Sequence, residues 1–286
     1  MRSETFSTPG PVRLDLELPA GAIELETAET DETHVELESA SGKASVEEMI
    51  ADARIELSRR GDVYQVSVEV RTRHGVWISF SSGPDIRLGT PDLRLRISCP
   101  KGAELDVRTK SADLRARGDY GKVDVKTASG DINIDEAADT YVKSASGDIH
   151  VELVDGTLDV KTASGDLHAG SVTRDANLNL VSGDVYIGDC GGSVSTNTVS
   201  GDQRYEAVVN GRVELRAVSG DIAVGIRRGS RVFIDANTVS GSTSSEFELA
   251  DAPQAAPNPD APLVEVFAKT VSGDVRLERA PAPAHA

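Results

Sequence analysis

Hydrophobic and polar residues alternate along most of this chain, and from residue 105 onward the alternation returns at a fixed interval. Aliphatic residues stand six and four positions before a Ser-Gly-Asp triplet and three and five positions after its serine. Alternation with a period of two predicts a β-strand with one buried face, and a Gly-containing triplet between two such runs predicts a tight turn. Each unit is therefore expected to form two short strands joined at a corner.

The Ser-Gly-Asp triplet sets the length of the repeat. Its serine recurs every 17 to 19 residues, at Ser129, Ser146, Ser164, Ser182, Ser200 and Ser219. A variant "SAD" precedes these at Ser111, while "SGS" at Ser240 and "SGD" at Ser272 follow, which makes nine units. The last interval is longer because it contains a Pro/Ala-rich insertion, which is typical of an exposed loop.

The outward positions favour parallel stacking of these units. Three residues before the serine, most units carry Lys, Arg or Asn. Recurrence of one chemical type at one position predicts that equivalent residues lie above one another, about 4.8 Å apart. The sequence thus predicts an all-β fold, a single-stranded parallel β-helix (β-solenoid) with about 18 residues per coil. One coil cannot offset the conformational entropy of its own chain, so stability must accumulate through the stacking interfaces.

The N-terminal part of the chain follows a different pattern. Its alternation predicts opening strands within 12–37 and strands at 63–70, 76–80 and 93–97, with a short helical segment within 43–62. Residues 1–100 are expected to form an atypical β-rich cap that includes Trp77 and Phe80, because an open solenoid end exposes a strand edge. Residues 101–279 then form the solenoid, with a loop near 250–262, and 280–286 form a disordered tail.

Composition narrows the range of partners. The formal net charge of −17 and the pI near 4.7 argue against nucleic acid and against an anionic membrane surface. The chain has neither an apolar leader nor a stretch long enough to span a membrane, which predicts a cytoplasmic protein without membrane insertion. The two cysteines, Cys99 and Cys190, have no metal-binding or redox spacing.

The aspartate of the triplet is the only candidate for site chemistry. Stacked carboxylates about 4.8 Å apart repel one another by about 3–4 kcal/mol at an effective dielectric constant of 20, so the column needs compensation. Calcium, which prefers oxygen ligands, is one source, with Asp131, Asp148, Asp166 and Asp184 as candidate ligands. Capping of the turn by Ser and Asp, with Gly supplying a positive φ, is the structural alternative.

No catalytic or cofactor-binding motif occurs in the sequence, so no catalytic residue and no cofactor other than calcium is predicted. His150 and His168 occupy nearly equivalent outward positions in neighbouring units, where their rings could stack. An aromatic content of only 4% does not favour a polysaccharide-cleaving β-helix, which needs aromatic side chains that stack on sugars.

The repeated V-x-V-K-T-A-S-G-D-I-x-I, after an N-terminal F-x-T-P-G-P-V-R-L-D-L-E-L-P-A-G-A-I-E-L, resembles the bacterial toastrack family, also known as the "putative adhesin" family. The resemblance covers nearly the whole chain. It implies a β-helix-like domain without established catalytic residues, often linked to the cell envelope or to envelope stress. The sequence differs from such members in lacking a signal peptide and a membrane span.

We therefore expect a non-catalytic scaffold that binds a protein partner or associates with itself, with any contact to the envelope made through a partner. Two alternatives remain open: a calcium-dependent binding module that uses the aspartate column, and a filament built by end-to-end stacking. A carbohydrate-active enzyme is the least favoured.

Overall fold

The computed structural model describes residues 1–40, 42–71, 92–247 and 261–280. Within these ranges the structure is all-β apart from one helix, and the chain divides into two compact units, Met1–Ile134 and Asp135–Ala286. Strand β8 (Ile132–Ala137) contains the boundary between them.

The first unit is built around one long strand, β2 (Val12–Ala28), which pairs in parallel with three others. These are β5 (Val63–Glu69), β6 (Leu93–Pro100) and β7 (Ala103–Lys126). The remaining pairs are antiparallel: β1 (Arg2–Ser7) with β3 (Glu32–Ser39), β3 with β6, and β4 (Arg54–Arg60) with β5. The first unit thus combines parallel and antiparallel pairs, whereas a separate cap at residues 1–100 stays a prediction.

The helical segment predicted within 43–62 is α1 (Ala44–Ala51). Val46 and Ile50, four residues apart and therefore on one face of the helix, are its buried side chains. The strand predicted at 76–80, with Trp77 and Phe80, lies outside the described residues.

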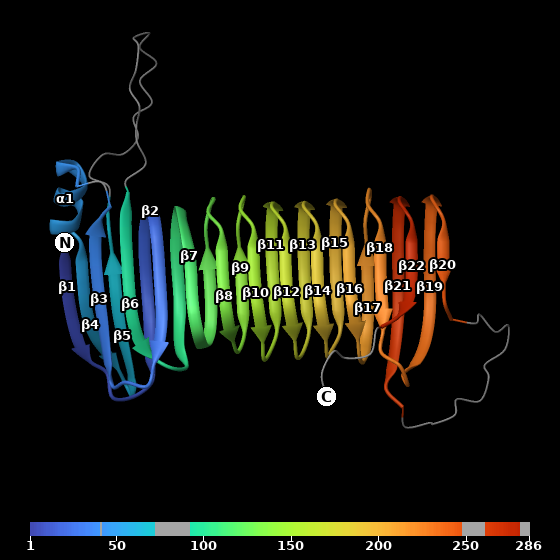
Figure 1. Cartoon of the computed structure of the whole chain (residues 1–286), viewed down its shortest axis with the longest axis horizontal. Coiled ribbons are helices and arrows are strands. Elements are labelled where there is room, and N and C mark those ends of the chain that lie inside the picture. The colour runs from blue at the N-terminus through green and yellow to red at the C-terminus, as the bar shows by residue number, and fades with distance from the viewer. Residues whose placement is uncertain (41, 72–91, 248–260, 281–286) are drawn as a thin grey trace, which may run out of the picture. The chain divides into compact units, whose positions relative to one another are not determined.

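The second unit is a parallel β-solenoid with two strands per coil, as predicted (Figure 1). One row contains, in order of pairing, β9 (Thr140–Lys143), β11 (Leu158–Ser164), β13 (Ala176–Ser182), β15 (Val194–Ser200), β17 (Gly211–Arg216), β21 (Leu263–Ser272) and β19 (Arg231–Ser240). The other contains β10 (Ile149–Val154), β12 (Leu167–Val172), β14 (Val185–Cys190), β16 (Gln203–Val208), β18 (Ile222–Ile226), β22 (Val275–Arg279) and β20 (Thr243–Ser245).

The order of the last two coils differs from the order of the chain. The coil formed by β21 and β22 lies between the coil of β17 and β18 and the coil of β19 and β20. Among the coils that the structure describes, the outermost is therefore 231–245, which carries the variant triplet "SGS". Its inward-facing Ile234 is only half-buried, whereas its paired residue Val266 is fully buried.

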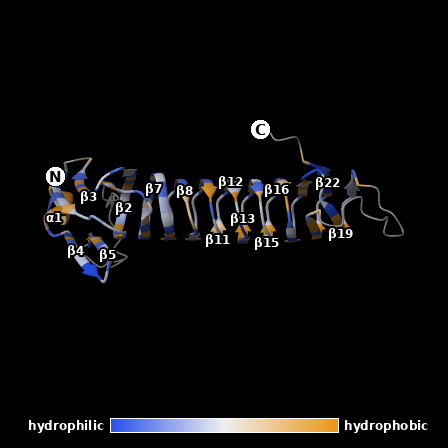
Figure 2. Ribbon diagram, turned by 90° about the horizontal axis from the view of Figure 1, so that it is seen from below, coloured by the Kyte–Doolittle hydropathy of each residue, from blue (hydrophilic) through white to orange (hydrophobic). Residues whose placement is uncertain are grey.

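Inside the coils, aliphatic columns form the core, and hydropathy alternates along the strands (Figure 2). The coil of β15 and β16 is an exception. The hydroxyl of buried Tyr205 donates to Oγ1 of Thr196 at 2.6 Å, and Nε2 of Gln203 donates to Oγ1 of Thr198 at 2.8 Å. The polar side chains that replace aliphatic ones in this coil therefore satisfy one another's hydrogen-bonding groups.

Candidate functional site

The Ser-Gly-Asp corners of the second unit stack directly on one another. Gly183 and Gly201 have φ values of 130° and 131°, a region that favours glycine. A Cβ on Gly201 would also collide with the carbonyl oxygen of Gly183 in the coil below. Glycine is thus required both by the backbone conformation and by the close approach of successive corners.

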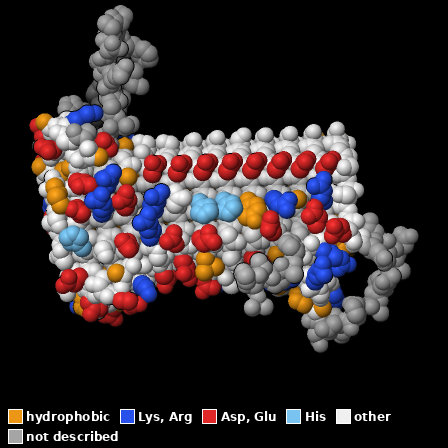
Figure 3. Space-filling view, viewed as in Figure 1, with side chains coloured by type: hydrophobic (Ala, Val, Ile, Leu, Met, Phe, Trp, Pro, Cys, Tyr) orange, Lys and Arg blue, Asp and Glu red, His pale blue; other side chains and the backbone are white. Residues whose placement is uncertain are grey.

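The aspartates after these glycines form a continuous ladder, seen as a straight row of red side chains in Figure 3. In the second unit, the aspartate ladder comprises Asp148, Asp166, Asp184, Asp202, Asp221 and Asp274. Each accepts, on Oδ1, the backbone N–H at the equivalent position of the next coil, at 2.8–2.9 Å. The final donor is the N–H of Ser242 in the outermost coil, and this hydrogen bond lowers the pKa of Asp274.

The turn capping that the sequence suggests is therefore made between coils. Of the four candidate calcium ligands, Asp148, Asp166 and Asp184 are consecutive members of the ladder. Asp131 belongs to the first unit, where its N–H donates to Oδ1 of Asp113 at 3.0 Å. Within the described ranges, no three His, Cys, Asp or Glu side chains are arranged to hold a metal ion. The N–H donors already compensate the carboxylates, and calcium binding stays a prediction.

In five successive coils of the second unit, the residue directly before the serine is an exposed valine, and the sequence reasoning missed this column. We define the valine ladder, in stacking order, as Val181, Val199, Val218, Val271 and Val239, with exposed fractions of 54%, 49%, 50%, 50% and 82%. The register places these residues side by side, since Ser182, Ser200, Ser219, Ser272 and Ser240 pair in that order. The overlooked signal is the change from Ala128, Ala145 and Ala163 to valine at this position.

A polar column flanks the valine ladder on the same outer face, two residues earlier along each strand. It consists of Asn179, Asn197, Arg216, Lys269 and Asn237. Nδ2 of Asn197 donates to Oδ1 of Asn179 at 3.3 Å, so the amides bond along the stacking direction. The valine ladder thus lies between a column that is neutral or positive and the negative aspartate ladder at the corner.

The other row of strands presents a short column of rings (Figure 3). His150 and His168 stack with their centroids 4.8 Å apart, and His168 stacks on Tyr186 at 4.4 Å. This confirms that the two histidines are equivalent in register. Because the rings cover one another's faces, they present mainly edges to solvent and offer little flat surface on which a sugar could stack.

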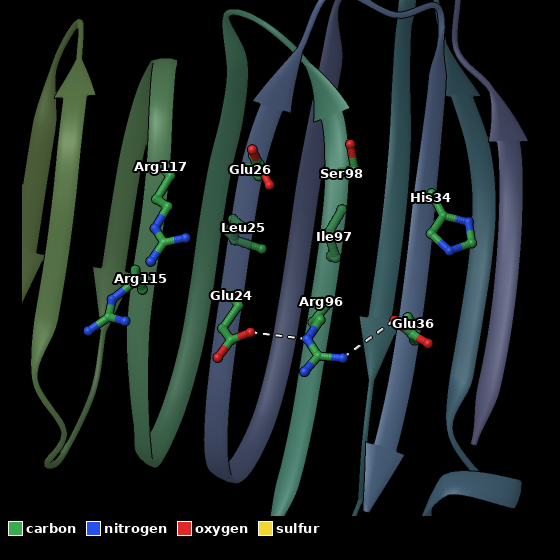
Figure 4. A pocket seen from close by; sticks show the side chains of 10 residues that line it. All are labelled: Glu24, Leu25, Glu26, His34, Glu36, Arg96, Ile97, Ser98, Arg115 and Arg117. Atoms are coloured by element: carbon green, nitrogen blue, oxygen red, sulfur yellow. Dashed lines mark hydrogen bonds and ion pairs between the residues drawn. The ribbon is translucent and has the colours of Figure 1, made fainter.

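A depression of about 300 Å³ lies on the outer face of the first unit (Figure 4). Arg96 bridges Glu24 and Glu36 there, with nitrogen–oxygen distances of 3.1 and 3.7 Å. Ser98 and His34 lie opposite each other on β6 and β3, but the ring of His34 is turned away from Ser98, toward Thr5. Catalysis by a serine needs a base within hydrogen-bonding distance, so this arrangement is not a nucleophile–base pair.

Both cysteines are free, buried thiols, and burial raises the pKa of Cys99 to about 12 and that of Cys190 to about 11. Thiols with such pKa values carry almost no thiolate at neutral pH and are unreactive. In the part of the chain that the structure describes, no helix has the length and apolar character needed to span a bilayer.

Three solved structures that resemble the chain are a "putative adhesin" from Bacteroides fragilis, one from Parabacteroides distasonis and a "putative cell adhesion protein" from Clostridium sporogenes. Their identities are 10%, 11% and 11%, with TM-scores of 0.42, 0.33 and 0.27. The matches cover 96%, 96% and 97% of this chain and 96%, 96% and 99% of theirs.

No curated protein matches the sequence. The model of the Toastrack family, DUF4097, a domain family of unknown function, matches residues 13–278. That span includes both the mixed strands of the first unit and the coils of the second, and the chain therefore belongs to the Toastrack family.

Proposed function

We propose that this chain is a non-catalytic protein-binding scaffold and that it binds its partner through the valine ladder. The observation that supports the proposal is a straight column of five valines, each about half exposed or more, on the outer face of a rigid parallel sheet. Contiguous apolar surface of this kind is uncommon on monomeric proteins and usually marks an interaction site.

Burial of this column would provide a useful binding energy. Covering the exposed half of five valines contributes about 4–7 kcal/mol before the cost of association. The sheet beneath is held by ladder hydrogen bonds on both sides of β13, β15, β17 and β21, so little conformational entropy is lost on binding. The ring column offers less apolar area, and the depression in the first unit is lined by neutralising ion pairs.

The test is site-specific photocrosslinking in cells that produce the protein. A photoreactive amino acid at Val199 should yield a discrete protein adduct, whereas the same group at Arg204, on the outer face of the other row of strands, should not. Val218→Ser and Val271→Ser in the same chain should abolish the adduct at Val199 without changing the melting temperature by more than a few degrees. Equal labelling from Val199 and Arg204, or no adduct at either, would overturn the proposal.

The predicted cytoplasmic location and the predicted link to the cell envelope stay predictions. The crosslinked partner would itself test the envelope link, because an adduct with an integral membrane protein is expected if that link exists.

A further inference from the structure

The spacing of the valine ladder restricts what can pack along it. Its side chains repeat about every 4.8 Å, the distance between hydrogen-bonded strands. A helix lying along the ladder presents side chains about every 5.4 Å, and is out of step by about 2.4 Å after four intervals. An extended strand presents side chains on one face about every 6.6 Å. Only another stack of strands has the same repeat, so it alone can place a side chain against every valine.

This chain itself provides such a stack, and charge selects how two copies would meet. Consider first a two-fold axis that lies in the plane of contact and is perpendicular to the ladder. It would place the aspartate ladder of one copy against that of the other, so that each carboxylate faces like charge. The residues concerned are Asp184, Asp202, Asp221 and Asp274. A two-fold axis along the ladder instead places the polar column of each copy beside the aspartate ladder of the other. Arg216 and Lys269 of one copy then approach Asp221 and Asp274 of its partner.

The area is sufficient for a dimer of moderate affinity. Five rungs span about 24 Å including their outer contacts, and six residues of each strand span about 20 Å. Two such faces in contact bury about 1,000 Å² in total, which is the lower end of the range for specific interfaces. Self-association should therefore be reversible and dependent on concentration.

We propose that the partner bound by the valine ladder is a second copy of this chain, in a parallel dimer whose two-fold axis runs along the ladder. Each valine then packs against the same valine of the other copy. This inference rests on the proposed function, because it names the occupant of the same surface. It differs from a filament, since the contact is lateral and closes on itself.

Cysteine crosslinking of the purified full chain distinguishes the arrangements. Val181→Cys, Val218→Cys and Val239→Cys are made separately and treated with a short bifunctional thiol reagent that reaches across sheets packed about 10 Å apart. The native cysteines are buried and unreactive, and so do not compete. In the parallel dimer all three variants crosslink to themselves. If the ladders were antiparallel, only Val218→Cys would do so, and Val181→Cys would crosslink to Val239→Cys.

Arg204→Cys is the matched control, an exposed cysteine on the other row that should give no dimer above background. Sedimentation equilibrium of the unmodified chain should show a monomer–dimer equilibrium, and Val218→Ser with Val271→Ser should raise its dissociation constant at least tenfold. A melting curve for each variant confirms that the fold is retained.

The possible outcomes separate the two proposals. Self-crosslinking at all three rungs together with a dimer in solution supports the inference. The antiparallel pattern, or a strict monomer at high concentration, overturns it. If the chain is monomeric but Val199 still yields an adduct with a different protein in cells, the scaffold proposal stands and the second copy is rejected. Failure of both measurements rejects both.

Discussion

The carboxylate of each triplet aspartate serves the neighbouring coil rather than its own turn. At Asp184, for example, Oδ1 accepts the N–H of Asp202, while its own N–H donates to Asp166. A short side chain with an acceptor oxygen is therefore needed at this position wherever another coil follows. Ser242, in the outermost coil, has no further coil of the described chain to serve, which accounts for the loss of aspartate from its triplet.

Replacement of one ladder aspartate tests this role. Asp184→Ala should lower the free energy of unfolding by about 1 kcal/mol, because the N–H of Asp202 loses its acceptor. Asp184→Asn retains Oδ1 and should cost clearly less. Urea denaturation measures both, and equal losses for Ala and Asn would show that the charge, not the hydrogen bond, matters.

Replacement of two other ladder aspartates addresses calcium binding. Melting after EDTA treatment and again with millimolar calcium gives the shift due to the cation. A clear increase in melting temperature that is absent in Asp148→Asn with Asp166→Asn would support the calcium-dependent alternative. The melting temperature should not change with calcium if the backbone N–H donors are sufficient to compensate the repulsion between the carboxylates.

Burial of the two thiols gives a further prediction at this scale. Since the pKa values of Cys99 and Cys190 are raised to about 12 and about 11, neither should react with a thiol reagent at pH 8 while the protein is folded. Both should react after denaturation in guanidinium. Rapid modification of the native protein would show that β6, which carries Cys99, or β14, which carries Cys190, opens locally.

Among the elements, the outermost coil depends on its neighbour in a pH-dependent way. The N–H of Ser242 lowers the pKa of Asp274 below its ordinary value of 3.8. A carboxylate whose pKa is depressed in the folded state contributes stability above its ordinary pKa and loses that contribution as the pH falls through the lowered value. Docking of β20 on β22 should therefore weaken only in acid.

Hydrogen exchange at the Ser242 amide can follow this docking. After correction for the intrinsic exchange rate, its protection should be constant from neutral pH to about pH 5 and should fall below the ordinary pKa of Asp. Asp274→Asn keeps an acceptor that does not titrate, so its protection should stay constant over the same range. A parallel loss in both proteins would point to acid unfolding of the whole unit.

The polar coil provides a prediction about internal packing. Tyr205→Phe removes the donor to Thr196 and leaves buried polar oxygens unsatisfied, which should cost about 1–3 kcal/mol of unfolding free energy. Tyr64→Phe, at a half-buried position in the first unit, is the control and should cost much less. Chemical denaturation of both variants makes the comparison, and similar losses would mean that the buried network adds nothing.

At the scale of the whole molecule, sequence patterns predict well where the strands lie. They predict less well which strands pair with one another. Alternation around each triplet fixes strand type, inward faces and corner positions, because these depend on local residues. The stacking order of 231–245 and 263–279 could not be predicted, because the two segments carry interchangeable patterns: Ile234 and Val266 would fill the same place over Val213. Two antiparallel pairs of the first unit, β1 with β3 and β3 with β6, likewise join segments far apart in sequence.

The candidate site was predicted in part. The aspartate column and the stacked histidines follow from register alone. The valine ladder escaped notice because valine is expected inside a strand. Each ladder valine directly follows a residue that faces inward, such as the buried Leu180, Thr198 and Thr270, and this position alone places the ladder on the outer face.

Interchangeable coils predict tolerance to truncation. A chain ending at residue 247 lacks β21 and β22, yet 231–245 can stack directly on β17 and β18 in the same register. Circular dichroism should still show β-structure, with a lower melting temperature because one stacking interface is lost. Rapid proteolysis within 231–247 of the truncated chain would show instead that this coil docks only on β21 and β22.

The position of β21 between β17 and β19 also has a consequence for synthesis. On the ribosome, residues 231–245 emerge before 261–280, at a time when the exposed edge of β17 is the surface nearest to them. Folding in the order of synthesis would fill that edge with the wrong segment. The finished protein therefore requires residues 261–280 to arrive before this docking becomes permanent, or the early coil to leave and dock again one place farther out. A segment that is synthesised later thus completes the interior of the stack.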